Sequence, residues 1–461
     1  MAPGGDTRYV DRRMDQPGQG PDTGAPSHQG PRPDMTGVAE LSGRPDGPAL
    51  PPPAGLAGQV RRMTGDVERH SARLGRRVVV DPVSLLVGRA GLSRFRRRGP
   101  FNCGGSARVM RSADGWMVAN LARPDDWDLL DAWLQPSSPL RPGRWEGVVA
   151  GVARQPTATL VERAALLGLP AAAVGERPAA GPGAAPGASD LPPSSAVHGV
   201  GARCLHPGRP ADALTDLLVV DLSALWAGPL ASQLLRAAGC RVLKVESVGR
   251  PDAARHGPPG FFSMVNGGKE SVALDVATAP GRRRLAALVA RADVVVTAAR
   301  PRALEQLGLR GDEWAARAGS RVWLAITGYG REGDSAGRVA FGDDAAAAGG
   351  LVVWEDRGPS FCGDAIADPL SGVAGAAAVL AALGEGGGWM VDVAMADVSA
   401  GCVGGPPADP QPGPGTGTST GGDHRPAGQV PESEWWPRSS PSDVAALGAD
   451  TEAVLADLGI G

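Results

Sequence analysis

The sequence predicts an α/β fold: a doubly wound, parallel sheet, with a smaller α+β domain beside it. Apolar runs suited to buried parallel strands recur along the second half of the chain, and helical stretches such as residues 281–292 separate them. Strands that alternate with helices form parallel sheets that bind ligands at the carboxyl ends of the strands. The expected strands are residues 217–222, 241–245, 271–274, 293–296, 322–327 and 389–395.

Composition narrows the class of protein. With 461 residues and 42% hydrophobic content the chain is long enough for two or more globular domains. A formal net charge of -3 gives no overall attraction to nucleic acid or to an anionic membrane, so an anionic ligand needs local positive charge. The N-terminus lacks a basic-then-apolar signal, and no uncharged run approaches the length of roughly 20 apolar residues that a membrane helix needs.

The five cysteines are scattered along the chain, odd in number and without CxxC spacing. This pattern favours neither a disulfide framework nor a zinc site, and we expect no metal. Free thiols suit a reducing compartment, so we expect a cytoplasmic protein.

Glycine and proline divide the chain into segments. The chain has 68 Gly and 43 Pro, and clusters of them mark linkers. We expect a mostly disordered extension over 1–55, a small domain over 56–175, a linker over 176–212, the α/β domain over 213–400, a second linker over 401–436 and a helical tail over 437–461.

The stretch 361–395 is predicted to be a loop, an Ala-rich helix, a Gly-rich turn and a strand. Asp is a favoured N-cap and Pro a favoured first helical residue, so Asp368 and Pro369 predict the helix start. There the helix dipole should keep Asp368 ionised. From these residues alone, Asp368 is either a helix cap or a reactive carboxylate.

Only two of the 46 basic residues are lysines, Lys244 and Lys269. In a chain so biased toward Arg, a compact ammonium is expected to be useful at those two positions. Neither GxGxxG nor GxxxxGK[ST] follows the first strand, so a nucleotide-binding Rossmann or P-loop site has little support.

At this point the order of motifs resembles the family III CoA-transferases, the CaiB/BaiF group, which also contains α-methylacyl-CoA racemases. The resemblance covers about 180 residues. Its strongest pieces are Val220-Asp221-Leu222, Ala227-Gly228-Pro229, Gly239 to Glu246, Asn266 to Asp275, Arg300-Pro301, Ile326-Thr327-Gly328-Tyr329-Gly330, Ala367-Asp368 and Val391-Asp392-Val393.

The resemblance implies a Rossmann-like CoA-transferase domain in which Asp368 is the catalytic nucleophile and acyl-CoA and a carboxylic acid are the substrates. It implies no permanently bound cofactor, and a homodimer as the assembly. Attack of the carboxylate on a thioester would give a covalent aspartyl intermediate. Lys269 suits a CoA phosphate, although a plain surface charge is equally expected. The positions implied to surround coenzyme A are Ala227, Gly228, Lys269, Arg300, Ala303 and Leu304.

The reaction also needs N–H donors for the developing oxyanion, and Gly-rich backbone can approach closely enough to provide them. Gly349-Gly350 or Gly386 to Gly388 are the expected donors.

The sequence departs from the family in three places. Arg302 stands where many relatives have Gly, and residues 341–344 lack the His that the racemases use. The small domain, which ordinarily follows the catalytic half, is expected here from residues 56–175, which resemble that later part.

We therefore expect an acyl-CoA:carboxylate CoA-transferase. A non-catalytic acyl-CoA-binding or assembly protein and a 2-methylacyl-CoA racemase are the alternatives.

Overall fold

The computed structural model describes residues 34–177, 190–192, 197–211, 213–258, 260–317, 319, 321–404 and 444–461. Its largest feature is a seven-stranded sheet with the order β4-β12-β9-β8-β5-β6-β7. Every neighbouring pair is parallel except β12 with β4. The strands are β4 (Val200–His206), β5 (Leu218–Asp221), β6 (Arg241–Ser247), β7 (Glu270–Leu274), β8 (Val294–Thr297), β9 (Arg321–Thr327) and β12 (Gly388–Ala394).

This order confirms the predicted doubly wound sheet. From β5 the chain builds outward through β6 and β7, and it then returns to β8 on the other side of β5 and continues through β9 and β12. The winding direction therefore reverses between β5 and β8, and in sheets of this type the crevice at that point is the usual ligand site.

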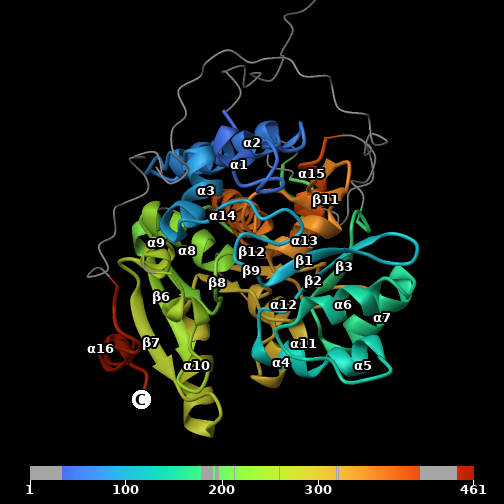
Figure 1. The fold of residues 1–461 in the computed structure, drawn as a ribbon. Helices are drawn as coiled ribbons and strands as arrows, with labels where there is room; N and C mark the ends of the chain where they lie inside the picture. The colour runs from blue at the N-terminus through green and yellow to red at the C-terminus, as the bar shows by residue number, and fades with distance from the viewer. Residues whose placement is uncertain are drawn as a thin grey trace, which may run out of the picture. The chain divides into compact units, whose positions relative to one another are not determined.

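Helices cover both faces of the sheet, because successive strand residues point to opposite faces. Val219, Val242 and Val391 join one hydrophobic core with helices α8 (Ala227–Ala237), α9 (Phe261–Asn266) and α14 (Ala367–Glu385). Val220, Leu243 and Met390 join the other with α10 (Ala279–Arg291), α11 (Pro301–Gln306), α12 (Gly311–Ala315) and α16 (Thr451–Asp457). Figure 1 shows this arrangement.

Helix α14 is the central helix of the first core. Of the helices in the described residues it alone is long and apolar enough to cross a membrane, but 89% of that stretch is buried inside the protein. Such burial is typical of a core helix. The Ala-rich composition suits this place because small side chains let α14 approach α8 closely. At the closest point a Cβ on Gly372 would lie 2.6 Å from the Ala227 carbonyl oxygen.

A separate three-stranded antiparallel sheet forms from the first half of the chain, with a hydrophobic core of its own. Its strands are β1 (Ala107–Arg111), β2 (Trp116–Asn120) and β3 (Ala171–Ala173), and the accompanying helices are α4 (Pro124–Asp128), α5 (Leu130–Leu134), α6 (Trp145–Val152) and α7 (Thr157–Leu167).

The segment before this sheet behaves differently from the prediction. Residues 34–106, here called the N-terminal helical segment, contain α1 (Thr36–Ala39), α2 (Leu56–Arg73) and α3 (Pro82–Ser93). Helices α2 and α3 contact α14, and buried Leu56, Val60 and Met63 belong to the core of the large sheet. The N-terminal helical segment therefore packs with the α/β domain. The disorder predicted for 1–55 does not extend over 34–55, and residues 1–33 lie outside the described residues.

The predicted linker over 176–212 is wrong at its end, where β4 forms the edge of the large sheet. Val200 and Ala202 are buried in the core, and this apolar alternation outweighs the surrounding Pro and Gly. The predicted linker over 401–436 lies outside the described residues from 405 on. The remaining elements are η2 (Leu214–Asp216), η3 (Ala253–His256), α13 (Gly342–Ala348), β10 (Val352–Glu355), β11 (Gly358–Phe361) and α15 (Met395–Gly401).

Candidate active site at the start of helix α14

Asp368 lies in the first turn of α14 rather than at its N-cap, because the helix starts two residues earlier than predicted. The helix begins at Ala367 after the N-cap residue Ile366, so Asp368 is the second helical residue. Because α14 leads into β12, which runs parallel to β9, the helix starts at the carboxyl edge of the parallel strands. Asp368 therefore stands at the edge where sheets of this type bind ligands.

Gly342, the first residue of α13, lies directly against Asp368. Its backbone N–H donates a hydrogen bond to the Asp368 carboxylate. A Cβ at Gly342 would overlap Asp368 Oδ2 and the Ala365 carbonyl oxygen. Only glycine permits this approach, and its N–H is the donor that the structure brings to the carboxylate.

Three aspartates crowd the start of α14. Asp343 and Asp364 are buried and Asp368 is partly buried. The pKa of Asp368 is raised to about 7, chiefly by burial; the carboxylates of Asp343 and Asp364 add to the rise, while Arg89 and the Gly342 N–H oppose it. Burial likewise raises the pKa of Asp343 to about 6. With a pKa of about 7, Asp368 is only partly ionised at neutral pH, because burial opposes the ionisation that the helix end favours.

The turn that leads into α14, residues 363–365, is held from several sides. The Gly363 N–H donates to Ser42 Oγ at 2.9 Å, and the Ala365 N–H donates to Asp343 Oδ1 at 2.9 Å. Ala365 adopts a φ of +43°, in the left-handed region that costs a residue with a Cβ. These bonds hold the strained turn and thereby fix the direction in which α14 starts.

Asp343 is fixed by a residue of the first half of the chain. Asn102 Nδ2 donates to Asp343 Oδ2 at 2.6 Å, and the Ala365 N–H occupies the other carboxylate oxygen. The next residue, Asp344, caps α13 by accepting from the Phe341 N–H at 3.1 Å, and burial raises its pKa to about 8.

Arg89, from α3, brings a positive charge to the cluster. Its Nε donates to Asp364 Oδ2 at 2.8 Å and its Nη2 to Asp364 Oδ1 at 2.5 Å. The guanidinium carbon lies 4.8 Å from the ring centroid of Trp226 and 5.5 Å from that of Phe261. The Asp364 carboxylate and the two aromatic rings therefore fix the orientation of this side chain.

Lys269 is not at a ligand surface. Its side chain is fully buried, and Nζ donates to Asp221 Oδ2 at 3.0 Å, Pro229 O at 2.9 Å, Ser232 Oγ at 2.8 Å and Asn266 Oδ1 at 2.9 Å. Every donor of the ammonium is used within the protein. This placement contradicts both the predicted CoA-phosphate contact and the alternative of a surface charge.

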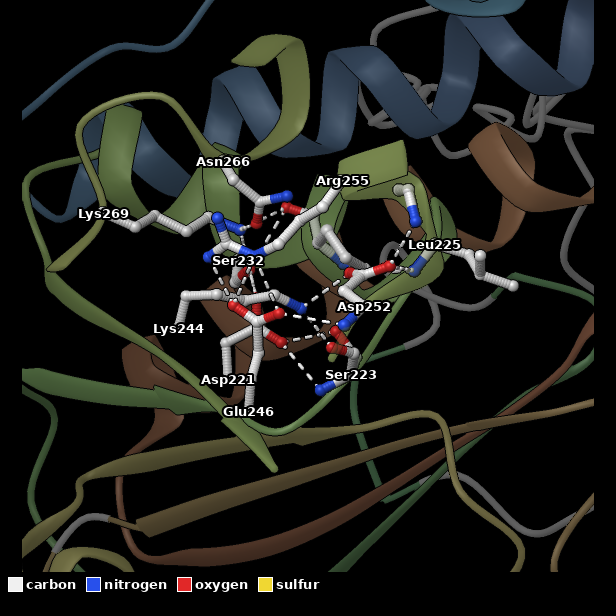
Figure 2. A network of polar contacts seen from close by, with 12 residues as sticks. Asp221, Ser223, Leu225, Ser232, Lys244, Glu246, Asp252, Arg255, Asn266 and Lys269 are labelled. Atoms are coloured by element: carbon white, nitrogen blue, oxygen red, sulfur yellow. Dashed lines mark hydrogen bonds and ion pairs between the residues drawn. The ribbon is translucent and has the colours of Figure 1, made fainter. Parts of the chain in front are cut away.

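Figure 2 shows that the second lysine belongs to the same buried network. Lys244 Nζ lies 3.0 Å from Asp252 Oδ2 and also donates to the Ser223 carbonyl oxygen. Opposing lysines lower the pKa of Asp221 to about 2 despite its burial, and burial lowers the pKa of Lys269 to about 8. The two lysines therefore neutralise buried carboxylates beneath the carboxyl ends of β5 and β6, where a compact ammonium fits.

Ala227 and Gly228 form the start of α8, directly after β5, and both are buried. Gly228 has a structural reason to be glycine, since a Cβ there would overlap the Ser223 side chain. Because Gly372, one turn after Asp368, packs on the Ala227 carbonyl oxygen, the structure brings the starts of α8 and α14 together.

Arg300, Ala303 and Leu304 follow β8, on the other side of the point where the winding reverses. Arg300 is the N-cap residue of α11, and Leu304 is buried beneath that helix. Arg300 also lines a cavity of about 590 Å³ at the carboxyl edge of the large sheet. The other lining residues are Arg123, Asp125, Asp126, Leu129, Ala165, Leu166, Leu167, Gly168 and Arg250.

This cavity carries exposed cations. The side chains of Arg250 and Arg300 make no hydrogen bond or ion pair with another described residue, and both are exposed. Arg123 is instead paired with Asp126 at 2.9 Å and with the Gly168 carbonyl oxygen at 2.8 Å. Two guanidinium groups beside apolar Leu129 and Leu166 suit a ligand with phosphates and an apolar portion.

The predicted oxyanion donors lie elsewhere. Gly386 to Gly388 follow the far end of α14, about 27 Å from its start by the rise of a 19-residue helix. They pack against Arg209, Gly208 and Ala315. Gly349 packs against α15. The backbone donor that the structure places at the Asp368 carboxylate is instead the Gly342 N–H.

The structure thus combines a doubly wound α/β domain with a carboxylate cluster at the carboxyl edge of its sheet. The family model of CoA-transferase family III matches residues 214–432. This match includes β5 to β12 and Asp368, and it confirms for this part of the chain the resemblance to the family III CoA-transferases.

Individual curated proteins are similar to part of this chain. An acyl-CoA transferase of Fusarium pseudograminearum is 34% identical over 205 residues, covering 40% of this chain and 45% of its own. A succinyl-CoA–D-citramalate CoA-transferase of Chloroflexus aurantiacus is 31% identical over 201 residues, covering 41% and 50%. A solved structure of a CaiB/BaiF family protein from Brucella suis matches with 32% identity, covering 42% and 55%, at a TM-score of 0.38. The chain spans about half the length of the curated relatives it matches.

Proposed function

We propose that the protein is an acyl-CoA:carboxylate CoA-transferase that uses Asp368 as a covalent nucleophile. The observation that carries the proposal is Asp368 itself: a partly buried carboxylate at the carboxyl edge of the sheet, touched by the Gly342 N–H, in the matched part of the chain. A carboxylate stripped of water is a better nucleophile than a solvated one.

The exchange takes place through two kinds of intermediate. An Asp368 carboxylate oxygen attacks the carbonyl carbon of the donor thioester, the C–S bond breaks, and CoA leaves as a thiolate. The product is a mixed anhydride. The thiolate then attacks the Asp368 carbonyl carbon, which releases the donor carboxylate and leaves an aspartyl-CoA thioester.

The second half repeats these steps with the acceptor. The acceptor carboxylate attacks the aspartyl thioester, giving a new mixed anhydride and CoA thiolate. Attack of the thiolate on the acceptor carbonyl carbon forms acceptor-CoA and restores the Asp368 carboxylate. No proton is consumed, and the Gly342 N–H stabilises negative charge on oxygen beside Asp368.

The cavity at Arg250 and Arg300 is the proposed place for the phosphates of coenzyme A. It lies where the loops after β6 and β8 meet, next to the reversal of the sheet winding. Ala303 and Leu304 continue from Arg300 along α11, and Ala227, at the start of α8, lies against Gly372 one turn after Asp368.

The function is tested by mixing the protein with several acyl-CoA donors and carboxylic acids and identifying new CoA thioesters by mass spectrometry. Transfer that requires an acceptor acid supports the proposal. Exchange of the α-hydrogen with deuterated solvent, without any acceptor, would instead indicate a racemase. CoA binding with neither reaction would indicate a binding protein.

The rate of transfer should depend on pH with the sign set by Asp368. Since only the ionised carboxylate attacks, and its pKa is about 7, we expect the rate to rise about tenfold per pH unit below 7 and to level off above about pH 8. Initial rates between pH 5.5 and 9 test this. A rate that is flat over this range would contradict it.

Unfolding is not expected to cause the loss of activity at low pH. The pKa values of Asp343, Asp344 and Asp368 are all raised in the folded state. The folded state therefore binds these protons more tightly than the unfolded state, and the contribution of these groups to stability falls as pH rises from about 4 to 8. Thermal unfolding at each pH provides the control.

Replacing Arg300 or Arg250 should weaken binding of CoA thioesters. Each charged hydrogen bond to a phosphate contributes about 1.5–3 kcal/mol, so Arg300→Ala and Arg250→Ala should each raise KM at least about tenfold while kcat changes little. The matched control is Arg283→Ala, an exposed arginine on α10 outside the cavity. An unchanged KM in both cavity variants would remove coenzyme A from this cavity.

A further inference from the structure

The clearest unassigned feature of the site is the role of the N-terminal helical segment, which lies outside the family match. Three of its residues hold the turn before α14: Ser42 bonds the Gly363 N–H, Cys103 Sγ lies 3.5 Å from the Gly363 carbonyl oxygen, and Arg89 pairs with Asp364. Of these three residues, only Arg89 is charged.

Arg89 is the one cation among the charged groups that chiefly act on the Asp368 carboxylate. The groups that act on its carboxylate are Arg89 on α3, Asp343 on α13 and Asp364 in the preceding turn. The carboxylates of Asp364, Asp343 and Asp368 in turn raise the pKa of Arg89. Burial and the carboxylates of Asp364 and Asp343 raise the pKa of the nearby Cys103 thiol, while Arg89 and Arg98 lower it.

The environment of Arg89 is built to hold one geometry. Both of its bonds go to Asp364, whose side chain is fully buried, while Trp226, Phe261 and Phe95 lie around the guanidinium. A lysine could supply the charge but not the two parallel bonds or the planar stacking. Such pairing in a partly dehydrated place is costly to form, and removing one partner leaves the other charge uncompensated.

We propose that Arg89 is a positioning residue for the reaction of Asp368: it fixes the turn 363–365 through Asp364 and supplies the positive charge that lets the carboxylate of Asp368 exist beside two others. This inference rests on the proposed function of Asp368 as nucleophile. It means that the N-terminal helical segment completes the site of the α/β domain, although it precedes that domain by more than a hundred residues.

The test measures ionisation directly, without any turnover. The full chain is labelled with ¹³C at the aspartate side-chain carboxyl carbon, and the Asp368 signal is assigned by its loss in Asp368→Asn. The signal is then followed by NMR between pH 4 and 9. We compare wild type with Arg89→Gln, Arg89→Lys and the double variant Arg89→Gln/Asp364→Asn.

Arg89→Gln leaves three carboxylates together without the cation that acts on the Asp368 carboxylate. The last ionisation step seen at Asp368 should then move to higher pH by about one unit or more. Arg89→Lys should move it less, and the double variant, in which both members of the ion pair are neutral, should return it close to the wild-type midpoint.

The matched control is Arg97→Gln. Arg97 belongs to the same segment and also makes an ion pair, with Glu40 at 2.9 Å, together with bonds to the Arg44 and Gly47 carbonyl oxygens. Arg97 is not among the groups that shift the pKa of Asp368. This variant should leave the Asp368 midpoint unchanged while losing a similar number of bonds.

An Asp368 midpoint that is the same in Arg89→Gln and wild type would overturn the inference. If Arg89→Gln does not fold, the double variant is compared with Arg89→Lys. An Asp368 midpoint that is shifted from wild type at least as far in the double variant as in Arg89→Lys would also overturn the inference. Because the titration needs no acyl-CoA, a failure of the proposed function would appear only in the transfer assay, and the two failures are distinguishable.

Discussion

Asp368→Asn is expected to abolish CoA transfer, by a factor of about 10³ or more, while the protein remains folded and still binds CoA thioesters. An amide cannot attack the thioester carbon, and no other step replaces the lost covalent route. The amide has nearly the same shape and can still accept from the Gly342 N–H. Steady-state rates and equilibrium binding of a CoA thioester measure the two effects separately.

Asp343→Asn provides the contrast for this variant. Asp343 is buried next to Asp368 and raises its pKa, but both of its carboxylate oxygens accept hydrogen bonds, from Asn102 Nδ2 and from the Ala365 N–H. Its removal should leave transfer measurable and shift the pH midpoint to lower values. Equal loss in both variants would mean that Asp368 has no special role.

Lys269→Met is expected to produce the largest loss of stability. The variant leaves the carboxylate of Asp221 in the interior without its nearest cation, and breaking a buried ion pair on one side costs about 3–5 kcal/mol. Lys244 acts on the same carboxylate, which keeps the cost within that range rather than above it. Denaturant unfolding measures the change.

Two further variants make the test specific. Lys269→Met/Asp221→Asn removes both charges and should recover much of the stability. Arg283→Met, at an exposed position on α10, should change stability by less than about 0.5 kcal/mol. If Lys269→Met instead raised KM for CoA thioesters and left unfolding unchanged, Lys269 would be a ligand after all.

The sequence was sufficient to predict the large sheet because its strands are continuous apolar runs. Residues 217–222 and 322–327 have no other stable place than a buried parallel strand, and the intervening helices fix the direction of winding. The edge strand β4 was missed because it pairs on one side only and lies in a Gly- and Pro-rich stretch. The packing of α2 on α14 depends on contacts between distant parts of the chain, which local patterns do not encode.

The site was predictable only where a motif carried it. Asp368 and Pro369 predicted a helix start at this place, two residues later than the observed start after Ile366. The ionisation of Asp368 depends on its burial and on Arg89 and Asp343, which the fold brings together from distant positions. The sequence did draw attention to Gly342 and Asp343, because residues 341–344 lack the His that the racemases use. That departure was the one signal that could have marked these two residues as part of the site. Lys269 misled because a lone lysine looks the same whether it meets a phosphate or a buried carboxylate.

The central claim is tested most directly by locating the covalent intermediate. The protein is incubated with acyl-CoA donors, trapped with hydroxylamine or borohydride, digested, and examined by peptide mass spectrometry. The account predicts a modification on Asp368, with a donor that also supports transfer, and none in Asp368→Asn. Transfer that proceeds with Asp368 unmodified, or an adduct that persists in Asp368→Asn, would contradict it.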